Sequence, residues 1–429
     1  MQDYFYFLNR KNVANGFRES LNSRFFVDKS MLIQTISEKI LTKEKWVCLS
    51  RPRRFGKTMA VEMLAAYYTK GLNTDFLFEK LQIKSVSTYY EHLNAHNVIM
   101  INFNDYFENN TVKQGIERIS QNLIHDLGQL CPGVLPEGQD LVLCLDMIEQ
   151  MYGYKFIFLI DEWDCVFRFH KGKKKEQEEF LSFLKLLFKD KSYVELVYMT
   201  GILPIKKYNT GSALNMFREY TMLEPKKLAP YFGFTENEIK KLCSQDVKLC
   251  FEELREWYNG YHMAEIGGIY NPRSVVEALE EGVCRDYWNK TGGFSELEEY
   301  ITMNFDGLGE AVTELVAGNE ISVDVLGFSN DLDSFNDKDE VITALIHLGY
   351  LSYSEDKVRI PNKEIREEFA NTIKKLSWGT VSQLLKQSRE LLEALLNCEE
   401  EKVGFLLEDV HDGMQEFKEY NNEHTLKCV

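Results

Sequence analysis

The segment SRPRRFGKT, residues 50–58, constrains this chain more than any other because it joins an apolar run to a helical pattern. Residues 46–49 predict a short buried strand, and residues 58–70 predict a helix with Gly71 at its carboxyl-terminal side. A Gly-Lys-Thr triplet at a strand-to-helix junction is typical of a phosphate-binding loop of the Walker A type. The open N–H groups and positive potential of a helix amino terminus favour an anion at that position.

The residue types of the triplet match the chemistry of a nucleotide triphosphate. Gly56 lets the backbone approach a phosphate, Lys57 can reach the β and γ phosphates, and the Thr58 hydroxyl can bind Mg²⁺. The position where the usual pattern has its first glycine holds Arg51, and Pro52 after it has no N–H group. The loop is therefore expected to turn differently and to offer one donor fewer.

The arginines of the loop are expected to offset the missing donor by their charge. The predicted nucleotide-contacting residues are Arg51, Arg53, Arg54, Phe55, Gly56, Lys57, Thr58 and Met59. The alternative is a basic surface loop that contains the triplet by chance. Clustered cations repel one another when no anion is present, and this favours the phosphate site in an otherwise acidic protein.

A second motif supplies the acidic partner. The apolar run of residues 156–160 leads directly into Asp161 and Glu162, as in a Walker B strand. Asp161 is predicted to hold Mg²⁺, directly or through water, and Glu162 to orient the attacking water. Carboxylates at the carboxyl end of a parallel strand lie where α/β sheets bind ligands. The alternative is a solvated acidic loop, in which Asp164 only caps the next segment.

The next apolar strand, residues 195–199, ends at Thr200, which is predicted to sense the γ phosphate. Lys206 and Lys207 follow on an expected loop and can act as charge sensors. Solvated lysines are the equally good alternative for that pair.

Apolar runs separated by helical patterns predict an α/β fold, a parallel sheet with helices on both faces. A phosphate-binding domain is expected over residues 1–225. A helical lid is expected over 226–300, with a capping box at Thr235 and Glu238. In the 301–380 region, a helix over 339–348 and a hairpin over 350–353 and 358–360 indicate a winged-helix-like unit. Residues 381–429 are expected to form a helical tail.

Composition narrows the class of protein. A length of 429 residues exceeds the roughly 250–300 residues of a single core, so more than one folding unit is expected. A net charge of −17 argues against wholesale wrapping of nucleic acid or of an anionic membrane. The nine cysteines form no CxxC pair, and no secretory leader or long apolar run is present. We therefore expect a cytoplasmic protein with reduced thiols.

The chain also resembles a known family, the AAA-ATPase-like proteins of bacteria and archaea, which are often fused to a PD-(D/E)xK nuclease domain. The blocks that carry the resemblance are FVDK (26–29), RPRRFGKT (51–58), LIDEWD (159–164), TG (200–201), GFT (233–235), WYNGY (257–261), YNPRSV (270–275), YW (287–288), HLGYL (347–351) and IPNKE (360–364). The resemblance implies a P-loop ATPase module for ATP and Mg²⁺ with a helical lid after it. An arginine-rich loop without the early glycine is the form this family has.

Residues 420–429 resemble the entry into the fused nuclease domain. A nuclease of that class needs an Asp and a Glu-x-Lys on adjacent strands to hold Mg²⁺, and residues after 421 do not supply them. We therefore expect no nuclease activity from this chain.

Two functions remain open on the sequence. The first is a slow ATPase, a hydrolase whose catalytic arginine comes from Arg54, Arg218 or another subunit. The second is a nucleotide-gated module that does not hydrolyse and regulates a fused or partner nuclease. A homo-oligomer or a protein partner fits either one, whereas the acidity of the chain disfavours DNA contact by the winged-helix-like unit.

Overall fold

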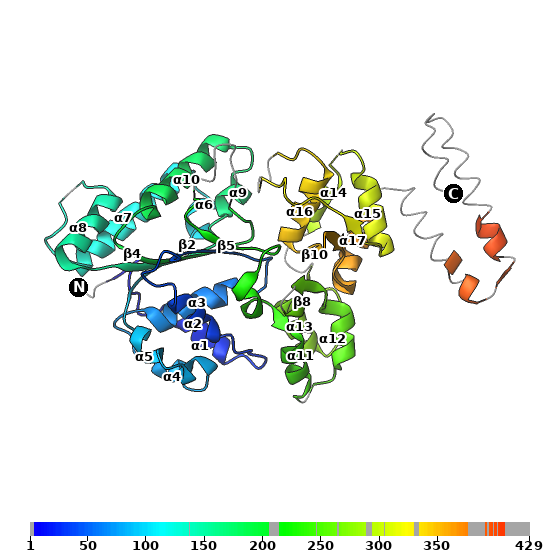
Figure 1. Cartoon of the computed structure of the whole chain (residues 1–429), viewed down its shortest axis with the longest axis horizontal. Helices are drawn as coiled ribbons and strands as arrows, with labels where there is room; N and C mark the ends of the chain where they lie inside the picture. Colours follow the sequence, from blue (N-terminus) through cyan, green and yellow to red (C-terminus); the bar gives the residue numbers. More distant parts are fainter. Residues whose placement is uncertain are drawn as a thin grey trace.

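The computed structural model describes residues 4–136, 138–205, 214–245, 247–263, 266–288, 294–303, 305–329, 334–375, 391–392, 394–397, 399–400 and 402–407. Figure 1 shows an α/β unit built from the first half of the chain, with a second, smaller unit beside it. The predicted helical tail, residues 381–429, lies largely outside the described residues.

A five-stranded parallel sheet forms the centre of the first unit, in the order β2-β3-β4-β1-β5. Its strands are β1 (Trp46–Ser50), β2 (Asn97–Asn102), β3 (Phe156–Asp161), β4 (Val194–Gly201) and β5 (Arg218–Tyr220). The parallel sheet predicted from the apolar runs is therefore confirmed. β5 escaped prediction because it has three residues, and the first two of them, Arg218 and Glu219, are charged.

Helices cover both faces of this sheet, as predicted (Figure 1). One face carries α1 (Asn15–Leu21), α2 (Met31–Ser37), α3 (Lys57–Tyr68), α4 (Asp75–Phe78), η1 (Gln82–Ser85) and α5 (Tyr89–His92). The other carries α6 (Asn104–Phe107), α7 (Val112–Leu130), α8 (Leu141–Tyr152), α9 (Cys165–Phe169) and α10 (Lys174–Phe188).

The two layers explain why the strands are apolar throughout. Successive side chains of a strand point to opposite faces. In β3, Phe158 and Ile160 belong to the core beneath α7, α8 and α10, whereas Ile157 and Leu159 belong to the core beneath α3. All six residues of β3 are buried, so an alternating polar pattern has no place in it.

The strand order fixes where a ligand can bind. From β1 the chain crosses to β2 at the far edge, returns through β3 to β4, and then passes β1 to form β5. The connections after β1 and β4 therefore leave in opposite directions, although the two strands are neighbours. Such a switch point opens a crevice at the carboxyl ends of the strands. Residues 51–58, 161–164 and 200–203 follow β1, β3 and β4 at that edge.

The segment after the main sheet mixes helices with a small sheet. Its elements are η2 (Lys226–Tyr231), β6 (Phe234–Thr235), α11 (Glu236–Cys243), α12 (Phe251–Tyr258), β7 (Tyr261–Met263), β8 (Gly267–Tyr270) and α13 (Pro272–Glu281). The predicted capping box of α11 is confirmed, since Thr235 and Glu238 exchange side-chain and backbone hydrogen bonds. The antiparallel sheet β6-β8-β7 was missed because its strands have two to four residues.

The last described elements form a compact unit around one buried helix. They are α14 (Phe294–Ile301), α15 (Leu308–Ala317), β9 (Ile321–Ser322), α16 (Lys338–Leu348), β10 (Ser352–Ser354), β11 (Lys357–Arg359) and α17 (Lys363–Lys375). The predicted helix and hairpin are present, and β9 adds a third strand. Every residue of α16 from 340 to 348 is buried, which leaves this helix no free face for DNA. No described helix is long and apolar enough to cross a membrane.

Glu364, at the start of α17, is buried where this helix meets residues 287 and 288. It accepts hydrogen bonds from the backbone N–H groups of Tyr287 at 2.9 Å and Trp288 at 3.0 Å. Burial outweighs these bonds and raises the pKa of Glu364 to about 7. A folded-state pKa above the unfolded value favours the protonated carboxyl. The resulting stability is therefore present at low pH and declines as pH rises from 4.5 through about 7.

We predict that Glu364→Gln removes this pH dependence, because the amide keeps an acceptor oxygen and cannot ionise. Relative to the variant, the wild type should lose roughly 1–3 kcal/mol of unfolding free energy between about pH 5 and about pH 8. Urea unfolding at both pH values measures the difference. Glu280→Gln, at an exposed acid, is the matched control. Parallel pH curves for wild type and Glu364→Gln would contradict the assignment.

Candidate functional site

The loop between β1 and α3 turns sharply before the helix begins. Arg54 has φ 69° and Gly56 has φ 86°, so both adopt the left-handed conformation. Gly56 is the N-cap of α3 and provides no side-chain hydrogen bond to the helix. Because the first N–H groups of an α-helix lack intrahelical partners, the amino end of α3 suits an anionic ligand.

Lys57 lies inside this loop. Its side chain is buried, and Nζ donates to the carbonyl oxygens of Arg51 and Pro52, both at 3.0 Å. Burial lowers the pKa of Lys57, while the nearby acids of the β3 loop, Glu162 foremost, oppose that shift. The charge of the acidic cluster therefore stabilises the ammonium group, while two loop carbonyls accept its hydrogen bonds.

The carboxylate of Asp161 joins three elements. The Thr58 hydroxyl of α3 donates to Oδ2 at 2.7 Å, and the Thr200 hydroxyl at the end of β4 donates to Oδ1. The backbone N–H of Glu162 also donates to Oδ1, at 3.0 Å. The structure thus brings together Thr58, Asp161 and Thr200, which lie far apart in the sequence. A carboxylate beside a hydroxyl supplies oxygen ligands of the kind that Mg²⁺ prefers.

Glu162 leaves the line of β3 because its backbone is left-handed, with φ 56°. Its carboxylate pairs with the guanidinium of Arg168 in α9. Burial raises the pKa of Glu162, and Lys57 and Arg168 oppose this rise. Arg168 was not predicted from the sequence, because only the turn after β3 brings it back to the acidic pair.

Asp164 holds the loop after β4. It is fully buried, and its Oδ2 accepts from the N–H groups of Ile202 at 3.1 Å and Leu203 at 3.0 Å. The expectation that Asp164 only caps the next segment is wrong, since α9 receives no side-chain cap from it. Close packing also requires Gly201, where an added Cβ would lie 2.6 Å from Asp164 Oδ1.

The arginines of the loop lie in three different settings. Arg51 is fully buried and donates to the carbonyl oxygens of Ser50 at 2.7 Å and Tyr220 at 3.0 Å, so it points toward β5. Burial lowers the pKa of Arg51 to about 9. Arg54 donates to the Tyr287 carbonyl at 2.8 Å, and Arg53 is exposed. Arg51 therefore supports the sheet, although we expected it to meet a phosphate.

Arg218 lies near the amino ends of the strands, whereas the site lies at their carboxyl ends. It begins β5, pairs in register with Val47 near the start of β1, and forms an ion pair with Glu44 at 2.8 Å. It therefore cannot supply a catalytic arginine to the site of its own chain. Lys206 and Lys207, which were suggested as charge sensors, lie outside the described residues.

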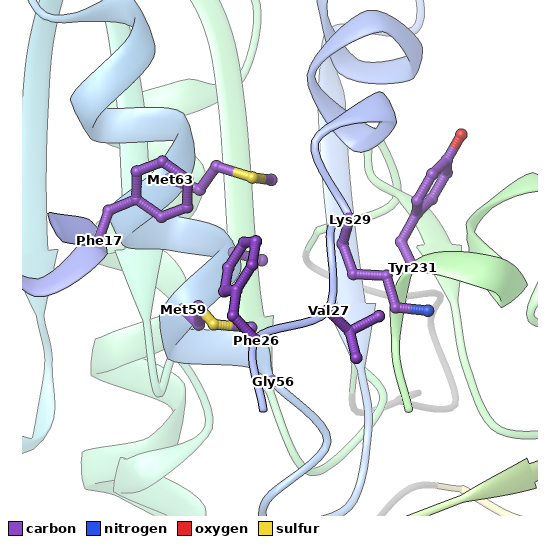
Figure 2. A pocket seen from close by; sticks show the side chains of 9 residues that line it. Phe17, Phe26, Val27, Lys29, Gly56, Met59, Met63 and Tyr231 are labelled. Atoms are coloured by element: carbon purple, nitrogen blue, oxygen red, sulfur yellow. The ribbon is translucent and has the colours of Figure 1, made fainter. Parts of the chain in front are cut away.

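A pocket opens beside the start of α3 (Figure 2). It encloses about 270 Å³, including the part that is open to solvent, and it is mainly apolar and aromatic. Its lining residues are Phe17, Phe26, Val27, Lys29, Gly56, Met59, Ala60, Met63 and Tyr231. Gly56 and Met59 were predicted to contact the ligand, and FVDK was noted only as a family block. Phe17 and Tyr231 were missed because they come from α1 and η2, far from the loop in sequence.

Lys29 fixes one wall of this pocket. Its Nζ donates to the Pro230 carbonyl and to both carboxylate oxygens of Glu238, each at 2.7 Å. Glu238 also completes the capping box of α11. The segment before α2 is thereby tied to η2 and α11.

Parts of this chain are similar to known proteins. Residues 17–210 match the AAA-ATPase-like family, described as a predicted AAA-ATPase. An uncharacterized protein from the vnfD 5′ region of Azotobacter chroococcum mcd 1 is 23% identical, over 91% of this chain and 75% of that protein.

Two solved structures are similar over most of their length. The Walker-type ATPase PABY2304 of Pyrococcus abyssi is 14% identical, with a TM-score of 0.36, over 80% of this chain and 94% of that one. The ORC2 protein of Aeropyrum pernix, solved as ADPNP and ADP complexes, is 12% identical, with a TM-score of 0.36, over 83% and 98%.

We predict that Thr200→Val, which keeps the shape but removes the donor to Asp161, destabilises the fold by roughly 1–3 kcal/mol. The reason is that a buried carboxylate oxygen then loses a charge-assisted bond. Thr69→Val is the matched control, because the Thr69 hydroxyl donates to the neutral carbonyl of Ala65, which also accepts the Thr69 N–H. Denaturant unfolding compares the two variants. Equal losses would show that the bond to Asp161 has no special weight.

Proposed function

We propose that this chain, whose residues 17–210 match the predicted AAA-ATPase family, binds ATP with Mg²⁺ at the carboxyl edge of its sheet and hydrolyses the nucleotide slowly. The observation that carries the proposal is the meeting of Thr58 and Asp161 directly beside Gly56 and Lys57. A hydroxyl, a carboxylate, a lysine and a helix amino terminus at one point are the parts that phosphoryl transfer on a P-loop requires.

The triphosphate fits the amino end of α3. Helix N–H groups and the positive end of the helix dipole favour its charge. Lys57 would exchange its bonds to the carbonyls of Arg51 and Pro52 for bonds to phosphate oxygens, so binding opens the loop. After this exchange the buried ammonium is bonded directly to an anion. Without nucleotide it is bonded to carbonyl oxygens, and the acids act on it only through their charge.

The metal fits the Thr58–Asp161 pair. Mg²⁺ is usually held by one or two carboxylates together with phosphate oxygens and water. Over the described part of the chain, no group of three or more His, Cys, Asp or Glu side chains is arranged to hold a metal. Mg²⁺ is therefore expected to arrive with the nucleotide. When bound it neutralises charge on the phosphates, and Glu162 orients the water.

We assign the base to the mouth of the pocket of Figure 2. The pocket shares Gly56 and Met59 with the start of α3, so a nucleotide whose phosphates meet the loop has its base within reach of Phe26 and Tyr231. Flat apolar rings pack well against aromatic and methionine side chains. Adenine is favoured over guanine by the family, and the sequence has no Asn-Lys-x-Asp guanine motif.

A specific observation also favours the second candidate, a nucleotide-gated switch without turnover. The loop that must open is in contact with the later segments of the chain. Arg54 donates to the Tyr287 carbonyl at 2.8 Å, the rings of Phe55 and Tyr261 lie 5.2 Å apart, and a Cβ on Gly349 would lie 2.7 Å from Pro52. Loop opening would therefore be transmitted to the lid and to the C-terminal unit.

We predict that Lys57→Ala abolishes measurable Mg·ATP binding, while Glu162→Gln binds normally and loses about 10²–10³-fold in turnover. Calorimetry gives the affinity, and steady-state phosphate release gives the rate. Lys80→Ala, at an exposed lysine, is the control for charge alone.

The outcomes separate the two candidates. Equal turnover in wild type, Lys57→Ala and Glu162→Gln would rule out hydrolysis at this site. Tight Mg·ATP binding with no turnover in the wild type would favour the switch. A wild type that binds no nucleotide would overturn both.

For the base pocket, we predict that Phe26→Ala weakens Mg·ATP binding by about 5–100-fold, the range expected from losing a ring that stacks on a base. Inorganic tripolyphosphate should bind the variant and the wild type equally, because it has no base. Phe76→Ala, at an exposed ring, serves as the control. Equal losses for both ligands would place the base elsewhere. Thermal melting of each variant checks that the fold is intact.

A further inference from the structure

Arg168, in α9, contacts the acidic loop but belongs to neither sequence motif. Its Nη2 donates to Glu162 Oε2 and also lies 3.3 Å from Asn104 Oδ1 in α6. Its Nε lies 3.6 Å from Asp164 Oδ2. The guanidinium is therefore held by three side chains, two from the loop after β3 and one from α6. Such multiple anchoring leaves it little freedom to turn.

The position of Arg168 relative to the other charges is equally constrained. Its side chain is 12% exposed and that of Glu162 is 18% exposed, so both groups are largely removed from water. The positive charge of Arg168 also acts on Lys57. Two cations, Lys57 and Arg168, thus share one cluster with the carboxylates of Asp161, Glu162 and Asp164.

The backbone of Glu162 adds a second constraint. Its φ of 56° is uncommon for a residue with a side chain, and such conformations persist only where the surroundings enforce them. The pair with Arg168 engages one carboxylate oxygen, Oε2. The backbone bend and the ion pair together determine the direction of the carboxylate.

We propose that Arg168 is a positioning residue for Glu162, holding the carboxylate by one oxygen so that the other can orient the water that attacks the γ phosphate. The inference rests on the proposed ATPase function and adds to it a residue outside both motifs. A base that is itself oriented by a third group is a general feature of activated water and nucleophiles. Asn104 supports the arrangement by accepting from Nη2, the same nitrogen that donates to Glu162.

The test is steady-state Mg·ATP hydrolysis by the full chain. Arg168→Gln should lower kcat about 10–100-fold while KM stays within about threefold of wild type, because the side chain acts on Glu162 and not on the nucleotide. Arg168→Lys keeps the charge without the planar fork, so it should restore only part of the rate. Asn104→Ala should lower turnover in the same direction but less. Lys175→Gln, at an exposed lysine, is the control.

Nucleotide affinity separates this inference from the proposed function. Calorimetry with a non-hydrolysable ATP analogue and Mg²⁺ should give dissociation constants within about threefold of wild type for all four variants, because none of these side chains is assigned to hold the nucleotide. A fall in turnover in Arg168→Gln that Arg168→Lys does not partly reverse, or that comes with a matching loss of analogue affinity, would reduce Arg168 to a structural role. An unchanged rate would overturn the inference, and so would a wild type that binds the analogue but never hydrolyses ATP. No analogue binding would instead overturn the proposed function itself.

Discussion

The hydrogen bond between the Thr58 hydroxyl and the Asp161 carboxylate is the interaction on which the site depends. It joins the first turn of α3 to the end of β3, two elements that the chain reaches about a hundred residues apart. Thr200 approaches the same carboxylate from β4, so three neighbouring parts of the sheet edge share one anion. The order β2-β3-β4-β1-β5 makes this possible, because it sets β4 between the strands that precede the two loops.

Most of the fold could be predicted, because local sequence patterns indicate its longer helices and strands. β1 to β4 are apolar on both faces and long enough to stand out, and the capping residues Thr235 and Glu238 lie three positions apart. The smaller sheets and β5 could not be predicted. Their strands have two to four residues and are defined by their partners, which no local pattern records. The described residues do not test the predicted domain boundaries or the helical tail, and both stay predictions.

The candidate site divides in the same way. Gly56, Lys57, Thr58, Asp161 and Thr200 were named from the sequence, because each stands at a strand end or a helix start. Arg168, Phe17 and Tyr231 were not named. The turn after β3 brings Arg168 back to the acidic pair, and tertiary folding brings Phe17 and Tyr231 to the loop. The direction of the Arg51 side chain could not be predicted either. The guanidinium is buried and bonded to carbonyl groups, and the sequence alone does not distinguish it from a basic residue of an exposed loop. Sequence thus identifies the groups that motifs fix in place and misses those that the fold assembles around them.

The most direct test of the account is a crystal structure of the chain with Mg²⁺ and a non-hydrolysable ATP analogue. We expect Lys57 Nζ to have left the carbonyls of Arg51 and Pro52 for the β and γ phosphates. The metal should lie against Thr58 and Asp161, and the base should lie against Phe26. A nucleotide bound anywhere else, or a Lys57 still bonded to the loop carbonyls beside a bound nucleotide, would contradict the account.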